Sequence, residues 1–153
     1  MKKALIIFTF IISAFVSASF AQKQIEPQIQ RDPILEADAK HNLDVSWQYF
    51  KLKKAYMAVL LRFEETFAAH PEFSKMDEFL YLAAMSSKNL AAGKGAQKII
   101  LSKLPEEERK KYEPTKLRED AVAYFNLIKD KYPQSKYIGE TEKQLKMLQK
   151  KWT

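Results

Sequence analysis

Hydrophobic positions along much of this chain recur at steps of three and four residues, the spacing of one face of an α-helix. The clearest stripe lies in the segment 117–132 and is formed by Leu117, Ala121, Phe125, Ile128 and Tyr132. A second stripe follows, with Ile138, Thr141, Leu145, Leu148 and Trp152. Pro133 separates the two and ends the first helix, because proline lacks an amide hydrogen and disfavours helical geometry in the preceding residue. Ser135 can accept a hydrogen bond from the free amides of the next helix. The pattern predicts a helix–turn–helix unit.

The same pattern occurs once more upstream. Pro71 and Pro133 lie 62 residues apart, and the residues before them correspond at that offset, Tyr56, Val59 and Phe63 with Arg118, Ala121 and Phe125. After the prolines the two copies align with a one-residue gap, which pairs Ser74, Asp77, Leu80 and Ala84 with Ser135, Ile138, Thr141 and Leu145. Two copies of one unit predict a helical-repeat protein. Because an ordinary repeat is about 34 residues long, an insertion is expected between the copies.

The remaining patterns are helical as well, and no segment shows the alternation of a strand. Helices are predicted over about 35–50, 54–69 and 75–91, then in the insertion 96–114, where Pro105 begins a short helix, and again from about Thr115. The residues expected to face inward on the first two are Ala39, Leu43, Trp47 and Phe50, then Tyr56, Val59, Leu60, Phe63 and Phe67. Gly93 and Gly95 are expected to form a helix C-cap and a turn. The expected fold is all-α, a tetratricopeptide-like α-solenoid of about five to six helices in antiparallel pairs.

The first residues are typical of a secretory signal peptide, with Lys2 and Lys3 before an apolar run and small residues around Phe20. Residues 1–21 are therefore expected to be removed, 22–34 to be a flexible lead-in, and 35–153 to form the repeat domain. An uncleaved membrane anchor is the alternative. Removal of the two lysines would lower the formal charge from +7 to +5. The chain has no cysteine, which excludes disulfides and a lipid-bearing cysteine. A periplasmic protein, soluble or peripheral to the outer membrane, is expected.

These residues carry a family resemblance over about 36–150. The pattern of Tyr56, Val59 and Phe63 before Pro71 resembles the tetratricopeptide repeats of the outer-membrane assembly lipoprotein BamD. The same is true of Ala121 and Phe125 followed by Tyr132-Pro133-Gln134-Ser135-Lys136-Tyr137, and of the long spacer between the two units. The resemblance implies an adaptor for outer-membrane protein assembly, with partners in the assembly machinery or among unfolded outer-membrane proteins. Related repeat proteins, including the Tol-associated cell-division coordinator, share the Tyr-Pro-x-Ser turn, so a Tol- or peptidoglycan-associated role is the alternative.

Two departures from BamD change what is expected. The anchoring cysteine is absent, and the chain has room for two or three repeats where BamD has about five. Val59 and Thr141 also replace a small alanine, which predicts looser local packing.

Little in the sequence indicates catalysis or a cofactor, and none is predicted. His70 is expected to pack in a turn, and His41 has no second histidine at helical spacing to complete a metal site. A small envelope hydrolase accessory is therefore the least favoured class, and export argues against nucleic acid. Protein binding remains, and peripheral membrane contact is compatible with the basic charge. The residues proposed for partner binding are Trp47, Tyr49, Arg62, Tyr81, Lys88 and Asn89. Trp47 and Tyr81 have core or edge packing as an alternative role.

Overall fold

The structure, a computed structural model, describes residues 31–96 and 98–150, and these contain helices and no strand. The elements, with η1 a π-helix and η2 a 3-10 helix, are α2 (Pro33–Gln48), η1 (Tyr49–Lys53), α3 (Tyr56–Ala69), α4 (Met76–Ala91), η2 (Leu101–Lys103), α5 (Glu106–Lys111), α6 (Pro114–Lys131) and α7 (Ile138–Lys150). The prediction of an all-α fold is confirmed for these residues. The predicted signal peptide and most of the predicted lead-in lie outside them.

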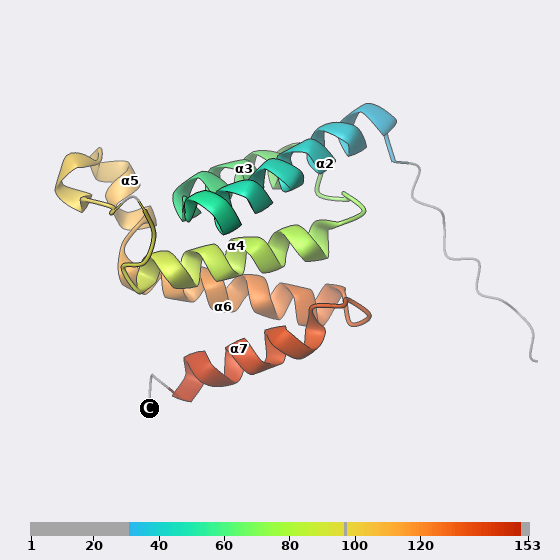
Figure 1. Cartoon of the computed structure of the whole chain (residues 1–153). Helices are drawn as coiled ribbons and strands as arrows, with labels where there is room; N and C mark the ends of the chain where they lie inside the picture. Colours follow the sequence, from blue (N-terminus) through green and yellow to red (C-terminus); the bar gives the residue numbers. More distant parts are fainter. Residues whose placement is uncertain (1–30, 97, 151–153) are drawn as a thin grey trace, which may run out of the picture. The chain divides into compact units, whose positions relative to one another are not determined.

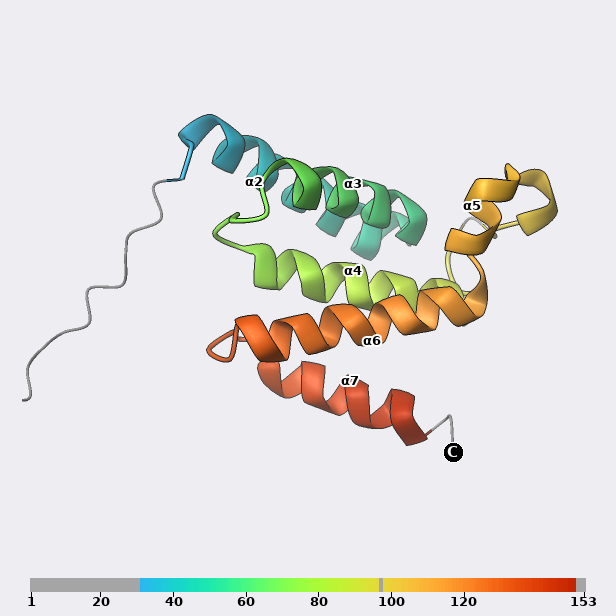
Figure 2. The ribbon, with the colours of Figure 1, turned by 180° about the vertical axis from the view of Figure 1, so that it is seen from behind.

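The five long helices pack in the order α2, α3, α4, α6, α7, each against the next (Figure 1). Successive helices run in opposite directions because short connections join α2 to α3, α3 to α4 and α6 to α7. Helices α2, α4 and α7 lie on the side facing the viewer in Figure 1. Helices α3 and α6 lie on the opposite side, which faces the viewer in Figure 2. The connection between α4 and α6 carries η2 and α5 and lies at one end of the helices. This segment is the insertion expected from the sequence.

The core is built from the apolar stripes that the sequence predicts. Phe63 and Phe125 are 2 % and 0 % exposed, so both repeat positions point inward as expected. The ring of Phe63 meets Phe79 of α4 and Tyr124 of α6 at 5.5 Å and 5.1 Å between centroids, and thereby joins three helices. Thr141 is also fully buried, but its hydroxyl has no hydrogen-bond partner among the described residues. Such a group weakens the packing by its lost hydration.

The two proline turns have the same hydrogen bonds at an offset of 62 residues. The amides of His70 and Tyr132 each donate to the carbonyl four residues earlier, both at 2.8 Å. Three further amides in each turn follow the same scheme, namely those of Phe73, Met76 and Phe79 in the first turn and those of Ser135, Ile138 and Thr141 in the second. The backbone at the end of each first helix is also alike, with φ and ψ of −146° and 72° at His70 and −130° and 57° at Tyr132. The helix–turn–helix unit therefore occurs twice with one backbone geometry.

This geometry corrects the alignment of the copies after the prolines. The offset stays at 62 throughout, so Ser135 corresponds to Phe73 and Thr141 to Phe79. The gap predicted from the sequence, which paired Ser74 with Ser135, is wrong. It matched two serines by type, whereas the shared backbone position holds an apolar ring in one copy and a hydroxyl in the other. The ring of Phe73 is buried, and the hydroxyl of Ser135 instead donates to Asp77 at 2.5 Å.

Several helix boundaries differ from the prediction for local reasons. Helix α2 begins at Pro33, inside the predicted lead-in, because the Asp32 carboxylate accepts hydrogen bonds from the next two free amides at 2.8 Å and 3.4 Å. The start of α3 is delayed to Tyr56 because Lys54 adopts the left-handed conformation, with φ of 49°. Pro105 precedes the first residue of α5 instead of beginning that helix. Each difference reflects a cap or a backbone turn that periodicity alone does not report.

Two more expectations concern single residues at the helix ends. Phe67 does not face inward as predicted: its side chain is 39 % exposed and lies against Phe63 at 5.5 Å. The glycine turn after α4 is confirmed, because Gly93 has a φ of 67° and its amide donates to Leu90. The amide of Lys94 donates to Asn89, which completes the paired hydrogen bonds of a Schellman C-cap.

Candidate partner-binding surface

The residues proposed for partner binding divide into two groups in the structure. Trp47, Tyr81, Lys88 and Asn89 lie along α4 and the neighbouring end of α2, and each is half-buried. Tyr49 and Arg62 lie elsewhere, in η1 and on α3. The first group forms one continuous surface, because polar contacts and stacked rings connect α2, α4 and α7.

Glu78, near the start of α4, is the centre of these contacts. Its carboxylate accepts a hydrogen bond from Nε1 of Trp47 at 2.8 Å and lies 3.4 Å from Nζ of Lys136. The hydroxyl of Tyr137 is hydrogen-bonded to the same carboxyl group. Burial by itself would raise the pKa of Glu78, but hydrogen bonds from Tyr137 and Trp47 and the charge of Lys136 outweigh it and hold the pKa below its usual 4.5. Glu78 is therefore an anion that fixes one side chain on α2 and two in the turn before α7.

Tyr81 lies one turn further along α4 and stacks on Tyr137, with 4.5 Å between the centroids and 17° between the planes. The edge of Tyr81 also approaches the buried ring of Phe125 at 6.3 Å. Burial, together with the charge of Glu140, raises the pKa of Tyr81, so its hydroxyl stays protonated at neutral pH. The ring of Tyr81 is half-buried in this stack, which agrees with the packing role expected as the alternative. Its contact with a partner stays a prediction.

Two turns beyond Tyr81, Lys88 donates a hydrogen bond to Gln144 of α7. Gln144 in turn donates to Glu140 at 2.6 Å. Asn89 follows Glu78 by eleven residues, which is about three helical turns, so both lie on one face of α4. We refer to the set Trp47, Glu78, Tyr81, Lys88, Tyr137 and Gln144 as the α4 surface.

Tyr49 and Arg62 do not belong to the α4 surface. The ring of Tyr49 lies under the ammonium of Lys53, 5.3 Å from its centroid. Arg62 pairs with Glu65 on its own helix at 3.1 Å, an arrangement of two solvent-accessible charges that contributes little to stability. The prediction of these two residues as contact residues rests only on their types, an aromatic ring and a long basic side chain.

Three members of the α4 surface were not predicted as site residues: Glu78, Tyr137 and Gln144. Tyr137 is the last residue of the turn motif Tyr132–Tyr137, and this motif is the feature of the sequence that could have indicated it as a site residue. Glu78 is half-buried and Gln144 is 4 % exposed, but nothing in their local spacing separates these two polar residues from the solvent-facing positions of their helices.

At least three cavities among the described residues lie away from the α4 surface, a small one of about 120 Å³ beside His70 and two wider ones. One of about 410 Å³ is bordered by the end of α4, by the insertion and by Tyr112. The other, of about 330 Å³, lies between α3 and α6 and includes Phe67, Leu127 and Tyr132. Lys94 and Lys98 line the first of these two, and Glu72 and Lys131 line the second.

His70 packs in a turn, as the sequence predicts. His70 is 7 % exposed, and its Nε2 lies 3.1 Å from the Glu36 carboxylate, so it packs in the first proline turn. The same carboxylate lies 3.3 Å from the amide of Ser74, which joins α2 to that turn. His41 is exposed on α2. Within residues 31–96 and 98–150, no group of three or more histidine or acidic side chains is arranged to hold a metal ion.

The described part of the chain defines an all-helical protein built on a repeated helix–turn–helix unit. None of its helices is both long and apolar enough to cross a membrane. No family model matches the chain, and neither curated proteins nor solved structures include a match.

Proposed function

We propose that this protein is a non-enzymatic helical-repeat adaptor that binds protein partners in the bacterial cell envelope, in the manner of the BamD-like tetratricopeptide proteins that its motifs resemble. The observation that carries the proposal is the pair of proline turns, which share their hydrogen bonds and backbone angles at an offset of 62 residues. The exported, periplasmic location rests on the signal-like segment 1–21.

The order of packing supports the tetratricopeptide-like arrangement. The second helix of the first unit, α4, packs against α3 of its own unit and against α6 of the next. Phe63 and Tyr124 bring the first helices of the two units together as well. Stacked units of this kind bury a continuous core and leave one ordered surface for a partner.

The α4 surface has the composition of a protein-binding site. Tyrosine and tryptophan provide large contact areas with few rotatable bonds, and they are enriched where binding energy is concentrated. Here Tyr81 and Trp47 are held in place by Tyr137 and Glu78, so little conformational freedom remains to be lost on binding. Lys88, a member of this surface, and the neighbouring Asn89 provide polar groups beside the aromatic rings.

Affinity purification from detergent-solubilised envelopes tests the partner class. We expect to recover the barrel-forming subunit of the outer-membrane assembly machinery, whereas recovery of Tol or wall-synthesis proteins would favour the alternative coordinator role. Lys88→Ala should reduce recovery about tenfold, as for a contributing contact residue, while the melting temperature falls only slightly. Lys129→Ala, at an exposed position of α6, is the matched control and should change neither. Equal recovery with both variants would show that the α4 surface is not used.

A further inference from the structure

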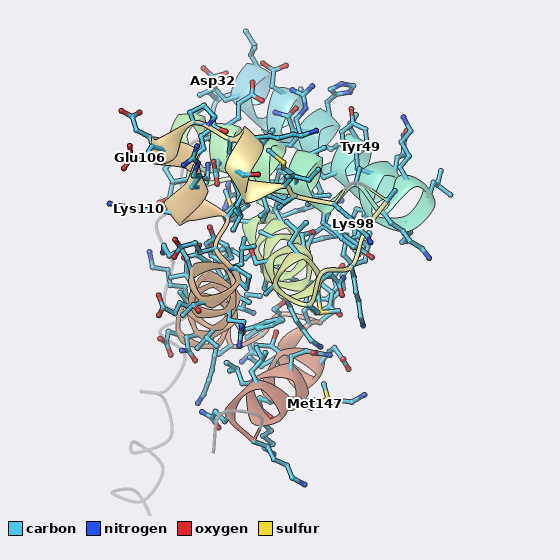
Figure 3. The ribbon with its side chains drawn as sticks, turned by 90° about the vertical axis from the view of Figure 1, so that its left-hand side faces the viewer. Asp32, Tyr49, Lys98, Glu106, Lys110 and Met147 are labelled. Carbon is cyan, nitrogen blue, oxygen red and sulfur yellow. The ribbon has the colours of Figure 1, made fainter. Side chains whose placement is uncertain are left out.

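One end of the helical stack carries a basic surface that the α4 surface does not include. Its members are exposed lysines from two segments, η1 with the residue after it and the loop that follows α4: Lys51, Lys53, Lys54, Lys94 and Lys98. We call this set the lysine end. Figure 3 views the molecule from this side, with Tyr49 and Lys98 labelled on neighbouring segments.

Backbone contacts hold the two segments of the lysine end together. The amide of Ala96 donates to the carbonyl of Lys54 at 3.2 Å. At Gly95 the chain passes so close that an added Cβ would lie 3.1 Å from the same carbonyl and 3.2 Å from the ring of Tyr56. The positive charges of segments about 40 residues apart in sequence therefore belong to one surface.

Acidic side chains do not offset this charge locally. The segments 45–63 and 79–105 contain no aspartate or glutamate, and Lys103 in the second adds a further positive charge. The ammonium groups of Lys51 and Lys53 lie over the rings of Trp47 and Tyr49, at 4.4 Å and 5.3 Å. Helix α5 carries three acidic and three basic residues, so it adds no net charge. It lies at the same end of the molecule but away from η1, as the labels of Glu106, Lys110 and Tyr49 in Figure 3 show.

Two aliphatic side chains project from the same segments. Leu52, between two of the lysines, is 80 % exposed, and Ile100, two residues after Lys98, is 50 % exposed. Exposed aliphatic groups of this size have an unfavourable contact with water. Lysines surrounding projecting aliphatic and aromatic residues are typical of protein surfaces that rest on anionic lipid.

We propose that the lysine end docks on a bilayer surface rich in anionic lipid, with the lysines at the head-group phosphates and Leu52 and Ile100 inserted below them. A bilayer accepts such a surface because its charges are mobile and its apolar layer lies directly beneath them. Clusters of four to eight basic residues are the size that anionic lipid attracts. The proposal does not depend on which protein occupies the α4 surface, although the two surfaces adjoin where Lys51 lies over the ring of Trp47.

Vesicle co-sedimentation of the full chain, purified as the host processes it, tests the proposal. Vesicles of phosphatidylcholine alone are compared with vesicles that also contain phosphatidylglycerol. We expect binding only to the second kind, weakened by added salt. The variant K51Q/K53Q/K54Q should bind on the order of 100-fold more weakly, since each lysine near an anionic surface contributes about fivefold. Leu52→Ser should weaken binding about tenfold through lost apolar burial.

The control K75Q/K129Q/K131Q makes the same change in charge at exposed positions near the proline turns. It should bind within a few-fold of the wild type, and thermal melts must show all variants folded. Every variant keeps the same N-terminal segment, so any affinity of that segment for lipid cancels in the comparison. The proposal fails if both triple variants lose affinity equally, or if neutral vesicles bind as well as anionic ones. It also fails if the lysine substitutions abolish binding to an acidic protein and leave vesicle binding unchanged.

Discussion

Phe125 gives the sharpest test of the repeated unit, because its role follows from both the sequence and the structure. The side chain, on α6, is 0 % exposed, and the ring of Tyr81 on α4 lies 6.3 Å away between centroids. Phe125→Ala removes the transfer free energy of the ring and leaves a cavity, together about 3–5 kcal/mol. A domain of this size has a total stability of about 5–15 kcal/mol, so a large part of it would be lost.

The assay is thermal unfolding followed by far-UV circular dichroism. For a chain of this length a loss of 1 kcal/mol lowers the melting temperature by about 3–5 °C, so Phe125→Ala should lower it by roughly 10–20 °C. Phe63→Ala, the same position in the first unit, should lower it by a similar amount because Phe63 is 2 % exposed and joins three helices.

Phe67→Ala is the matched control for this prediction. It removes the same ring from the same helix as Phe63, but Phe67 is 39 % exposed, and the loss should be about 1 kcal/mol. If Phe125→Ala melts within a few degrees of the wild type, or if Phe67→Ala costs as much as Phe125→Ala, the assignment of the buried repeat positions is wrong.

Two further predictions concern the loop after α4 and the centre of the α4 surface. Gly95→Ala should destabilise the fold by more than Gly93→Ala, because both have positive φ but only the Cβ at 95 would meet the Lys54 carbonyl and the Tyr56 ring; equal denaturant midpoints for the two variants would contradict this. Because the pKa of Glu78 is lower in the folded state, its contribution to stability is present above about pH 4.5 and is lost as the pH falls through the folded-state pKa. The melting temperature of wild type should therefore exceed that of Glu78→Gln at neutral pH and approach it below pH 4.5, and a difference that does not change with pH would contradict the assignment.

The helices and the two proline turns could be predicted because their signals are local. Periodic apolar residues such as Val59, Phe63 and Phe125 define faces, and a proline followed by a serine defines a turn. The predicted alignment after the proline is wrong because equivalent positions in the two turns do not hold the same type of residue. Phe73 and Ser135 occupy the same backbone position with opposite polarity, and only the hydrogen bonds of the turns reveal it.

The α4 surface could be predicted only in part. Residue type alone indicates Trp47 and Tyr81, which are large aromatic residues. They are oriented by Glu78 and Tyr137, which come from other helices or turns. The contacts that matter join residues 31 to 59 positions apart in sequence. Such pairings depend on how units stack, which periodicity along a single helix does not specify. The close approach of Gly95 to Lys54 could not be predicted from the sequence for the same reason.

The two copies of the unit differ in residues that face a neighbouring helix in one copy and water in the other. Helix α4 lies between α3 and α6 and is buried on both sides, so Leu80 and Ala84 are 0 % exposed. At the offset of 62 their counterparts on α7 are Glu142 and Lys146, both exposed, and no described helix packs against that side of α7. Charged side chains are suited to a helix face that remains in contact with water. Both copies therefore share the backbone geometry of the turn. Their second helices differ at two positions one turn apart, which are apolar on α4, where a further helix packs, and charged on α7, where no described helix does.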